Sequence, residues 1–130
     1  MSKVIIIMGS ESDKDFVQKI TTKLNELKIE FEEHIASAHK QPKEVLAIIE
    51  KNNESDDKLC YITVAGRSNA LSGFTAANAK QPVIACPPLK DKMDYMVNIH
   101  STLQMPSKVP VMTVIDPGNA ALAVQRILNL

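Results

Sequence analysis

Cysteine is scarce in this sequence, and neither sign of charge is in excess. Cys60 and Cys86 each lie inside an apolar run and form no CxxC pair, so we expect two buried structural thiols rather than a zinc or redox site. The 15 basic and 15 acidic residues cancel. The chain therefore lacks the basic surplus that phosphate backbones and anionic membranes attract, and we expect neither nucleic acid nor a membrane as a partner.

Long hydrophobic runs are missing too. The first run, residues 4–8 (VIIIM), is too short to cross a membrane, and Gly9 breaks it before any signal-peptide cleavage pattern appears. A cytoplasmic protein is therefore expected. The chain does have 45% hydrophobic residues in 130 positions, enough to bury one core without disulfides or metals. We expect a single domain over residues 1–130.

Apolar runs alternate with segments of helical pattern. The runs expected to form strands are residues 4–8, 31–36, 59–65, 83–86 and 109–115. The first is apolar throughout, which fits a central strand, whereas the second is partly polar and fits an edge. Helices are expected after each strand, including one near 69–80 and one near 95–103. Five such βα units predict an α/β fold, with a doubly wound, five-stranded parallel sheet in a flavodoxin-like three-layer sandwich.

Ligands of such sheets bind outside the carboxyl ends of the strands, which directs attention to the loops that follow them. The first of these loops reads GSESD, residues 9–13. Free backbone N–H groups at a helix start favour an anion, and two serine hydroxyls add donors. Because neither a Walker loop nor a GxGxxG turn is present, a small phosphate ester is the expected ligand. Ser12 or Asp13 could instead be an ordinary helix cap, and this loop alone leaves both interpretations open.

The loop after the second strand reads SAHK and carries the stronger signal. The imidazole of His39 can give or take a proton, as histidine side chains commonly do, while Ser37 and Lys40 can orient and neutralise a phosphate. His34 lies within the partly polar strand and His100 within a helix, so we expect structural roles for both.

The third loop, residues 65–73, reads AGRSNALSG, and its small residues would let a ligand approach the backbone closely. Arg67 could contact that ligand or a neighbouring subunit, and Ser68 or Asn69 could simply cap the next helix. Residues 87–88 (PP) follow the fourth strand and could either wall a pocket or only end the strand. The sequence leaves these alternatives open.

Taken in order, these loops resemble those of small purine-biosynthesis enzymes that carboxylate aminoimidazole ribonucleotide or move a carboxyl group on it. GSESD is similar to the family's GSxSD, and SAHK to its SAH followed by a basic residue. Residues 85–88 (ACPP) and 101–106 (STLQMP) fit later segments of the family. The resemblance covers essentially the whole chain, with four motifs in the family's order.

The third loop distinguishes the two classes of this family. Mutases of class I typically read AGGAAHLPG there, whereas AGRSNALSG is similar to class II, whose members use free carbon dioxide. Lys40, where class I has arginine, points the same way. The resemblance implies a carbon–carbon lyase that carboxylates 5-amino-1-(5-phosphoribosyl)imidazole with carbon dioxide in IMP biosynthesis. The alternatives are an N5-carboxyaminoimidazole ribonucleotide mutase and, from another class, a non-catalytic sensor of a phosphate ligand.

The resemblance also implies a role for individual residues, with His39 as the catalytic proton-transfer residue. The implied substrate-binding residues, first around phosphate and ribose and then around the carboxyl group, are Ser10, Ser12, Asp13, Ser37 and Lys40, and Ser68, Asn69 and Ala70. No cofactor or metal is implied. The family commonly continues into a further helix that packs on neighbouring subunits, whereas this sequence ends at Leu130. The resemblance implies a homo-oligomer with an octamer suspected, and the shorter C-terminus leaves the number of subunits open.

Overall fold

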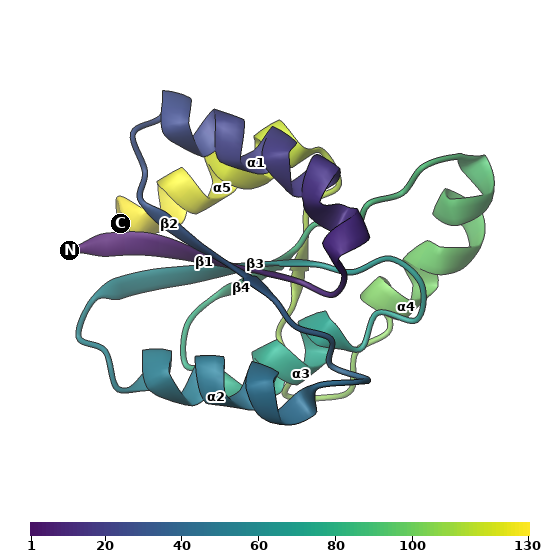
Figure 1. The fold of residues 1–130 in the computed structure, drawn as a ribbon, viewed down its shortest axis with the longest axis horizontal. Coiled ribbons are helices and arrows are strands. Elements are labelled where there is room, and N and C mark those ends of the chain that lie inside the picture. Colours follow the sequence, from purple (N-terminus) through teal and green to yellow (C-terminus); the bar gives the residue numbers. More distant parts are fainter.

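The computed structural model describes residues 1–130 as a parallel sheet between two layers of helices (Figure 1). The strands are β1 (Ser2–Met8), β2 (Phe31–Ile35), β3 (Lys58–Val64), β4 (Val83–Ala85) and β5 (Met112–Thr113). Their order is β2-β1-β3-β4-β5, and all neighbouring pairs are parallel. The flavodoxin-like order expected from the sequence is confirmed, with β1 inside the sheet and β2 at an edge.

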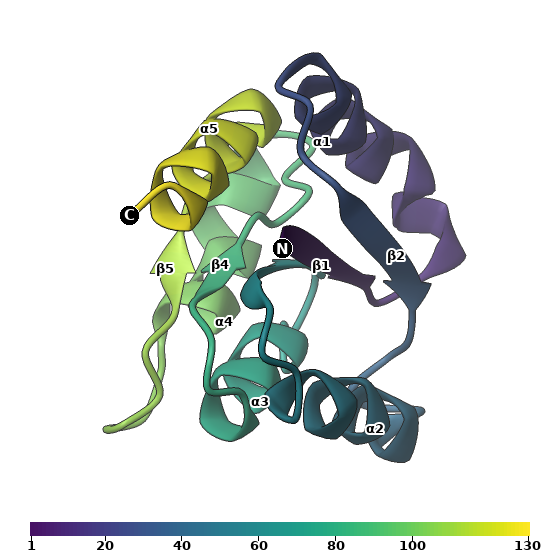
Figure 2. The ribbon, with the colours of Figure 1, turned by 90° about the vertical axis from the view of Figure 1, so that its left-hand side faces the viewer.

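Two helices cover each face of the sheet (Figure 2). The pair on one face is α1 (Lys14–Glu26) and α5 (Pro117–Leu128), and the pair on the other is α2 (Pro42–Asn53) and α3 (Leu71–Asn78). Along β1, Val4 and Ile6 belong to the core under α1 and α5, while Ile5 and Ile7 belong to the core over α2 and α3. Because side chains alternate between two buried faces, β1 has to be apolar at every position.

Most elements differ from the expected ranges by only one or two residues at their ends, and two differ more. The helix expected near 95–103 is a π-helical turn, η2 (Asp94–Asn98), that continues into α4 (Ile99–Leu103). The fifth strand, expected over 109–115, pairs only at Met112–Thr113. Its partner β4 is three residues long, because Pro87 follows closely and supplies no N–H to a ladder. A short β4 leaves β5 little to pair with.

The post-strand loops lie at one edge of the sheet, at the right of Figure 1, and the segment that carries η2 and α4 projects beyond that edge. This arrangement gathers side chains from distant parts of the sequence, as the sequence analysis expected. None of the helices combines the length and apolar character that a bilayer-spanning segment needs.

Candidate active site

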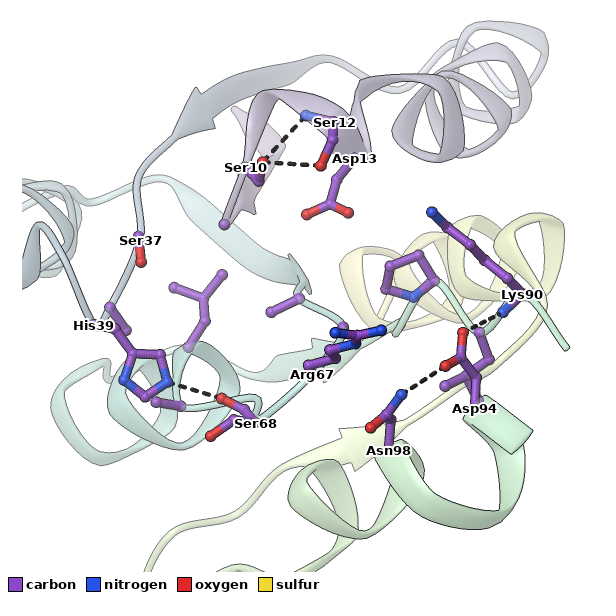
Figure 3. A pocket seen from close by; sticks show the side chains of 18 residues that line it. Ser10, Ser12, Asp13, Ser37, His39, Arg67, Ser68, Lys90, Asp94 and Asn98 are labelled. Atoms are coloured by element: carbon purple, nitrogen blue, oxygen red, sulfur yellow. Dashed lines mark hydrogen bonds between the residues drawn. The ribbon is translucent and has the colours of Figure 1, made fainter. Parts of the chain in front are cut away.

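A pocket of about 400 Å³ opens at the carboxyl ends of β1 to β4, lined by the loops that follow them (Figure 3). The lining residues that the sequence analysis had singled out as site residues are Ser10, Ser12, Asp13, Ser37, His39, Ser68 and Ala70. Three loops separated by up to about half the chain therefore contribute to one cavity, as the parallel topology requires.

The first loop forms a short 3-10 turn, η1 (Glu11–Asp13), whose cap is Ser10. The Ser10 hydroxyl accepts a hydrogen bond from the Ser12 backbone N–H at 3.2 Å, and the two hydroxyl oxygens lie 2.9 Å apart. Helix α1 begins only at Lys14, and Asp13 makes no side-chain cap bond to it. Ser10 therefore takes the capping role, while the Ser12 hydroxyl and the Asp13 carboxyl remain directed at the pocket (Figure 3).

Asp13 is a partly buried carboxyl group with a cation nearby. Burial raises its pKa above the usual value, because removal from water disfavours the charged form, while Lys90 from the loop after β4 pulls the pKa down. A backbone hydrogen bond to Ser10 acts in the same direction as Lys90. The balance leaves the pKa of Asp13 raised, and the carboxyl group faces the pocket with Lys90 across from it (Figure 3).

Replacement of Lys90 by methionine should raise the pKa of Asp13 further. The substitution removes the attraction that favours the carboxylate and leaves the desolvation that disfavours it. The midpoint of the Asp13 carboxyl 13C shift during an NMR pH titration measures this change. Lys92→Met is the matched control, since Lys92 is not among the groups that shift Asp13. A midpoint that stays fixed or falls in the Lys90 variant would contradict the assignment.

The second and third loops meet at His39. Its Nε2 lies 2.9 Å from the backbone carbonyl oxygen of Ser68, which is the hydrogen bond drawn in Figure 3. Within the second loop, the Ser37 hydroxyl accepts a hydrogen bond from the Lys40 backbone N–H at 3.2 Å. The histidine on the loop after β2 is thus held directly against the loop after β3.

Two of the predicted substrate-binding residues do not line the pocket. Lys40 is exposed, and its side chain lies outside the lining set. Asn69 is only 5% exposed, and its side-chain amide hydrogen-bonds Ser72 and Thr102 behind the loop. Direct contact of either residue with a substrate therefore stays a prediction, and the structure gives Asn69 a supporting position instead.

The structure decides the place of one open residue, Arg67, and adds three pocket residues that the sequence did not indicate. Arg67, left open between ligand and subunit, lines the pocket together with Lys90, Asp94 and Asn98. Asp94 accepts hydrogen bonds from the Lys90 N–H at 3.0 Å and from the Asn98 amide at 2.6 Å. These bonds, the first above all, lower the pKa of Asp94. The rule that places ligands at strand ends also covers the loop after β4, but no motif marks its charged residues.

Known proteins resemble this chain in both sequence and structure. A family model described as AIR carboxylase matches residues 3–130. A protein of Archaeoglobus fulgidus named phosphoribosylaminoimidazole carboxylase is 50% identical over 128 residues, which cover 98% of this chain and 69% of that protein. The N5-carboxyaminoimidazole ribonucleotide mutase of Methanocaldococcus jannaschii is 42% identical, with 98% and 79% covered. The crystal structure of Treponema denticola PurE superposes with a TM-score of 0.94 at 42% identity and covers 99% of this chain and 81% of its own.

Proposed function

The chain belongs to the AIR carboxylase family, and from that premise we propose that it carboxylates 5-aminoimidazole ribonucleotide (AIR) with carbon dioxide in purine biosynthesis. The observation that carries the proposal is the contact between His39 and the Ser68 carbonyl, at 2.9 Å. It sets a proton-transfer group against the AGRSNALSG loop, whose similarity to class II favours free carbon dioxide as the second substrate. The serines of the first loop line the same pocket.

The proposed reaction needs one carbon–carbon bond and one proton transfer. The aminoimidazole is an enamine, so its ring carbon attacks carbon dioxide and becomes tetrahedral. A general base must then remove the ring proton to restore aromaticity, and His39 is the group within the pocket suited to that step. The same histidine returns the proton when the reaction runs backwards.

We assign the other predicted site residues to the two ends of the substrate. We assign the phosphate to the hydroxyls of Ser10, Ser12 and Ser37, with Lys40 assisting, because hydroxyl donors and a cation suit a phosphate. The ribose hydroxyls fall to Asp13, a carboxyl group that can accept from them. Ser68 and Ala70 belong to the carboxyl end, where small side chains admit neutral carbon dioxide and hydrogen-bond donors stabilise the carboxylate, while Asn69 supports this loop from behind.

A mutase that moves the carboxyl group of the N-carboxylated isomer is the alternative within the family, and the Methanocaldococcus relative carries that name. The two activities differ in their use of free carbon dioxide. A carboxylase uses the N-carboxylated isomer only after this isomer has lost its carbon dioxide to the medium and become AIR. The carboxylated product formed from it under 13C-labelled carbon dioxide should then carry the label by mass spectrometry. Unlabelled product formed faster than AIR is carboxylated would identify the mutase.

We also propose that the protein acts as a cytoplasmic homo-oligomer, with an octamer as the expected form. Large apolar side chains gather on the projecting segment, where Met93, Met96 and Val97 are 66%, 71% and 55% exposed. Grouped exposure of this kind marks an interaction surface, and a second copy of the chain fits the family's subunit packing. The test is the mass in solution.

Replacement of Met96 by glutamate should lower the mass of that assembly. A charge at the centre of an apolar contact is costly to bury, whereas on a free surface it is harmless. Sedimentation velocity at several protein concentrations measures the mass, and Lys92→Glu, a charge change on the same segment, is the control. The proposed surface would be contradicted if the unmodified protein were a monomer. It would also be contradicted if the Met96 variant had the same mass as the unmodified protein.

A further inference from the structure

The backbone of the third loop is unusual at Ser68. Its φ is +45°, in the left-handed region that residues with a Cβ seldom occupy. A serine stays in that conformation only where its surroundings hold it. Ser68 itself is exposed, so the restraint has to come from the residues that flank it.

The restraint begins at the next residue, Asn69, whose backbone N–H and side-chain amide are both hydrogen-bonded. Its backbone N–H donates to the Ser101 hydroxyl at 2.8 Å. Its side-chain NH₂ donates to the hydroxyls of Ser72 at 2.7 Å and Thr102 at 3.0 Å, and its side-chain oxygen accepts from the Ser72 N–H at 3.1 Å. Ser101 in turn donates to the Asn98 carbonyl at 3.0 Å.

These bonds form a largely buried network that anchors the third loop at two places. Ser72 is fully buried at the start of α3, and its hydroxyl lies 2.8 Å from that of Thr63 in β3. Thr102 is 1% exposed on α4. Since buried polar groups that are fully paired are rigid and costly to disrupt, Asn69 has one well-defined position between α3 and α4.

A fixed Asn69 fixes the direction of the Ser68 carbonyl, because that carbonyl and the Asn69 N–H belong to the same planar peptide unit. The N–H side of this unit is bound to Ser101, and the carbonyl side meets His39 Nε2 at 2.9 Å. A carbonyl oxygen only accepts hydrogen bonds, so the hydrogen in this contact resides on Nε2. One peptide unit thus connects the buried network to the imidazole.

We propose that the Asn69 network, made of Asn69, Ser72, Ser101 and Thr102, positions His39 for proton transfer by holding the Ser68 carbonyl against Nε2. The Ser68 carbonyl orients the imidazole ring and keeps the imidazole hydrogen on Nε2. The carbonyl itself takes up no proton. Asn69 and its partners are positioning residues that act through Ser68 and do not touch substrate. The inference deepens the proposed function and rests on it for the role of His39.

Two substitutions break the network while leaving the pocket lining intact. Ser101→Ala removes the acceptor of the Asn69 N–H, and Thr102→Val removes one acceptor of its amide while keeping the side-chain shape. Ser101→Thr retains the hydroxyl and should behave like the unmodified protein. Thr75→Val is the control for a buried hydroxyl, since Thr75 is fully buried on α3 and its Oγ1 has no partner.

The first readout is 15N NMR of the His39 ring without substrate, which does not depend on the proposed reaction. The unmodified protein should show one tautomer, with a slowly exchanging hydrogen on Nε2. Ser101→Ala and Thr102→Val should show averaged ring-nitrogen shifts and fast exchange, whereas Ser101→Thr and Thr75→Val should not. Spectra of the first two that match the unmodified protein, or equal changes in Thr75→Val, would overturn the proposal.

The second readout is turnover of AIR. In Ser101→Ala and Thr102→Val, kcat should fall by about tenfold to a hundredfold, the range expected when a reacting group loses its position by up to about 1 Å. KM should stay unchanged, because the residues proposed to bind the phosphate, Ser10, Ser12 and Ser37, are not altered. A rise in KM at constant kcat would overturn the positioning role. If the unmodified protein turns over no AIR, the proposed function fails, while the NMR comparison still decides whether the network orients His39.

Discussion

Replacement of His39 by asparagine is expected to reduce kcat for AIR carboxylation by about 10²-fold or more, the contribution typical of a general acid–base group. Asparagine is polar and of similar reach but cannot carry a proton between substrate and solvent. Nucleotide affinity should change little, because other residues are proposed to bind the phosphate. Initial rates at saturating AIR, together with calorimetric binding of the nucleotide, separate these two effects.

The matched control is His100→Asn, which makes the same change on α4, outside the pocket lining. Its kcat should equal that of the unmodified protein. Full activity in the His39 variant would refute the assigned role. A chain that binds nucleotide but shows no turnover, with or without His39, would instead be the non-catalytic sensor.

Replacement of Ile62 by alanine should lower the free energy of unfolding by about 2–5 kcal/mol, the range found when a large aliphatic side chain is deleted from a core. Ile62 is fully buried on β3, with β1 on one side and β4 on the other. Denaturant unfolding followed by circular dichroism, at one fixed protein concentration, measures the change.

Leu130→Ala deletes a comparable side chain that is 93% exposed, and it should change the unfolding free energy by no more than about 0.5 kcal/mol. If the free energy of unfolding fell as little in Ile62→Ala as in the control, Ile62 on β3 would not be a stabilising part of the core. The consequence reaches the site, since the third loop begins where β3 ends.

The fold could be predicted because its strands leave a plain mark in the sequence. A strand buried on both faces has to be apolar at consecutive positions, as β1 is, and the edge strand β2 has to face solvent on one side and turns partly polar. The parallel order then placed His39 and Ser68 at one edge of the sheet, although 29 positions separate them. That juxtaposition followed from topology alone.

The direction of individual side chains could not be predicted in this way. An asparagine in a loop of small residues looks the same whether its amide faces a ligand or turns back toward a helix. Asn69 turns back because its partners Ser101 and Thr102 come from α4, more than 30 positions later. The sequence does not indicate the pocket positions of Lys90 and Asp94 for a related reason. These positions depend on how the loop after β4 folds over the pocket.

The central claim is that this pocket joins carbon dioxide to an aminoimidazole ribotide, and the most direct test supplies those two substrates alone. The purified protein is incubated with AIR and 13C-bicarbonate, without ATP, and the nucleotides are separated and weighed by mass spectrometry. The proposal predicts a carboxylated nucleotide that carries one labelled carbon, formed far faster than with the His39→Asn protein. Recovery of unchanged AIR, or equal rates for the two proteins, would contradict it.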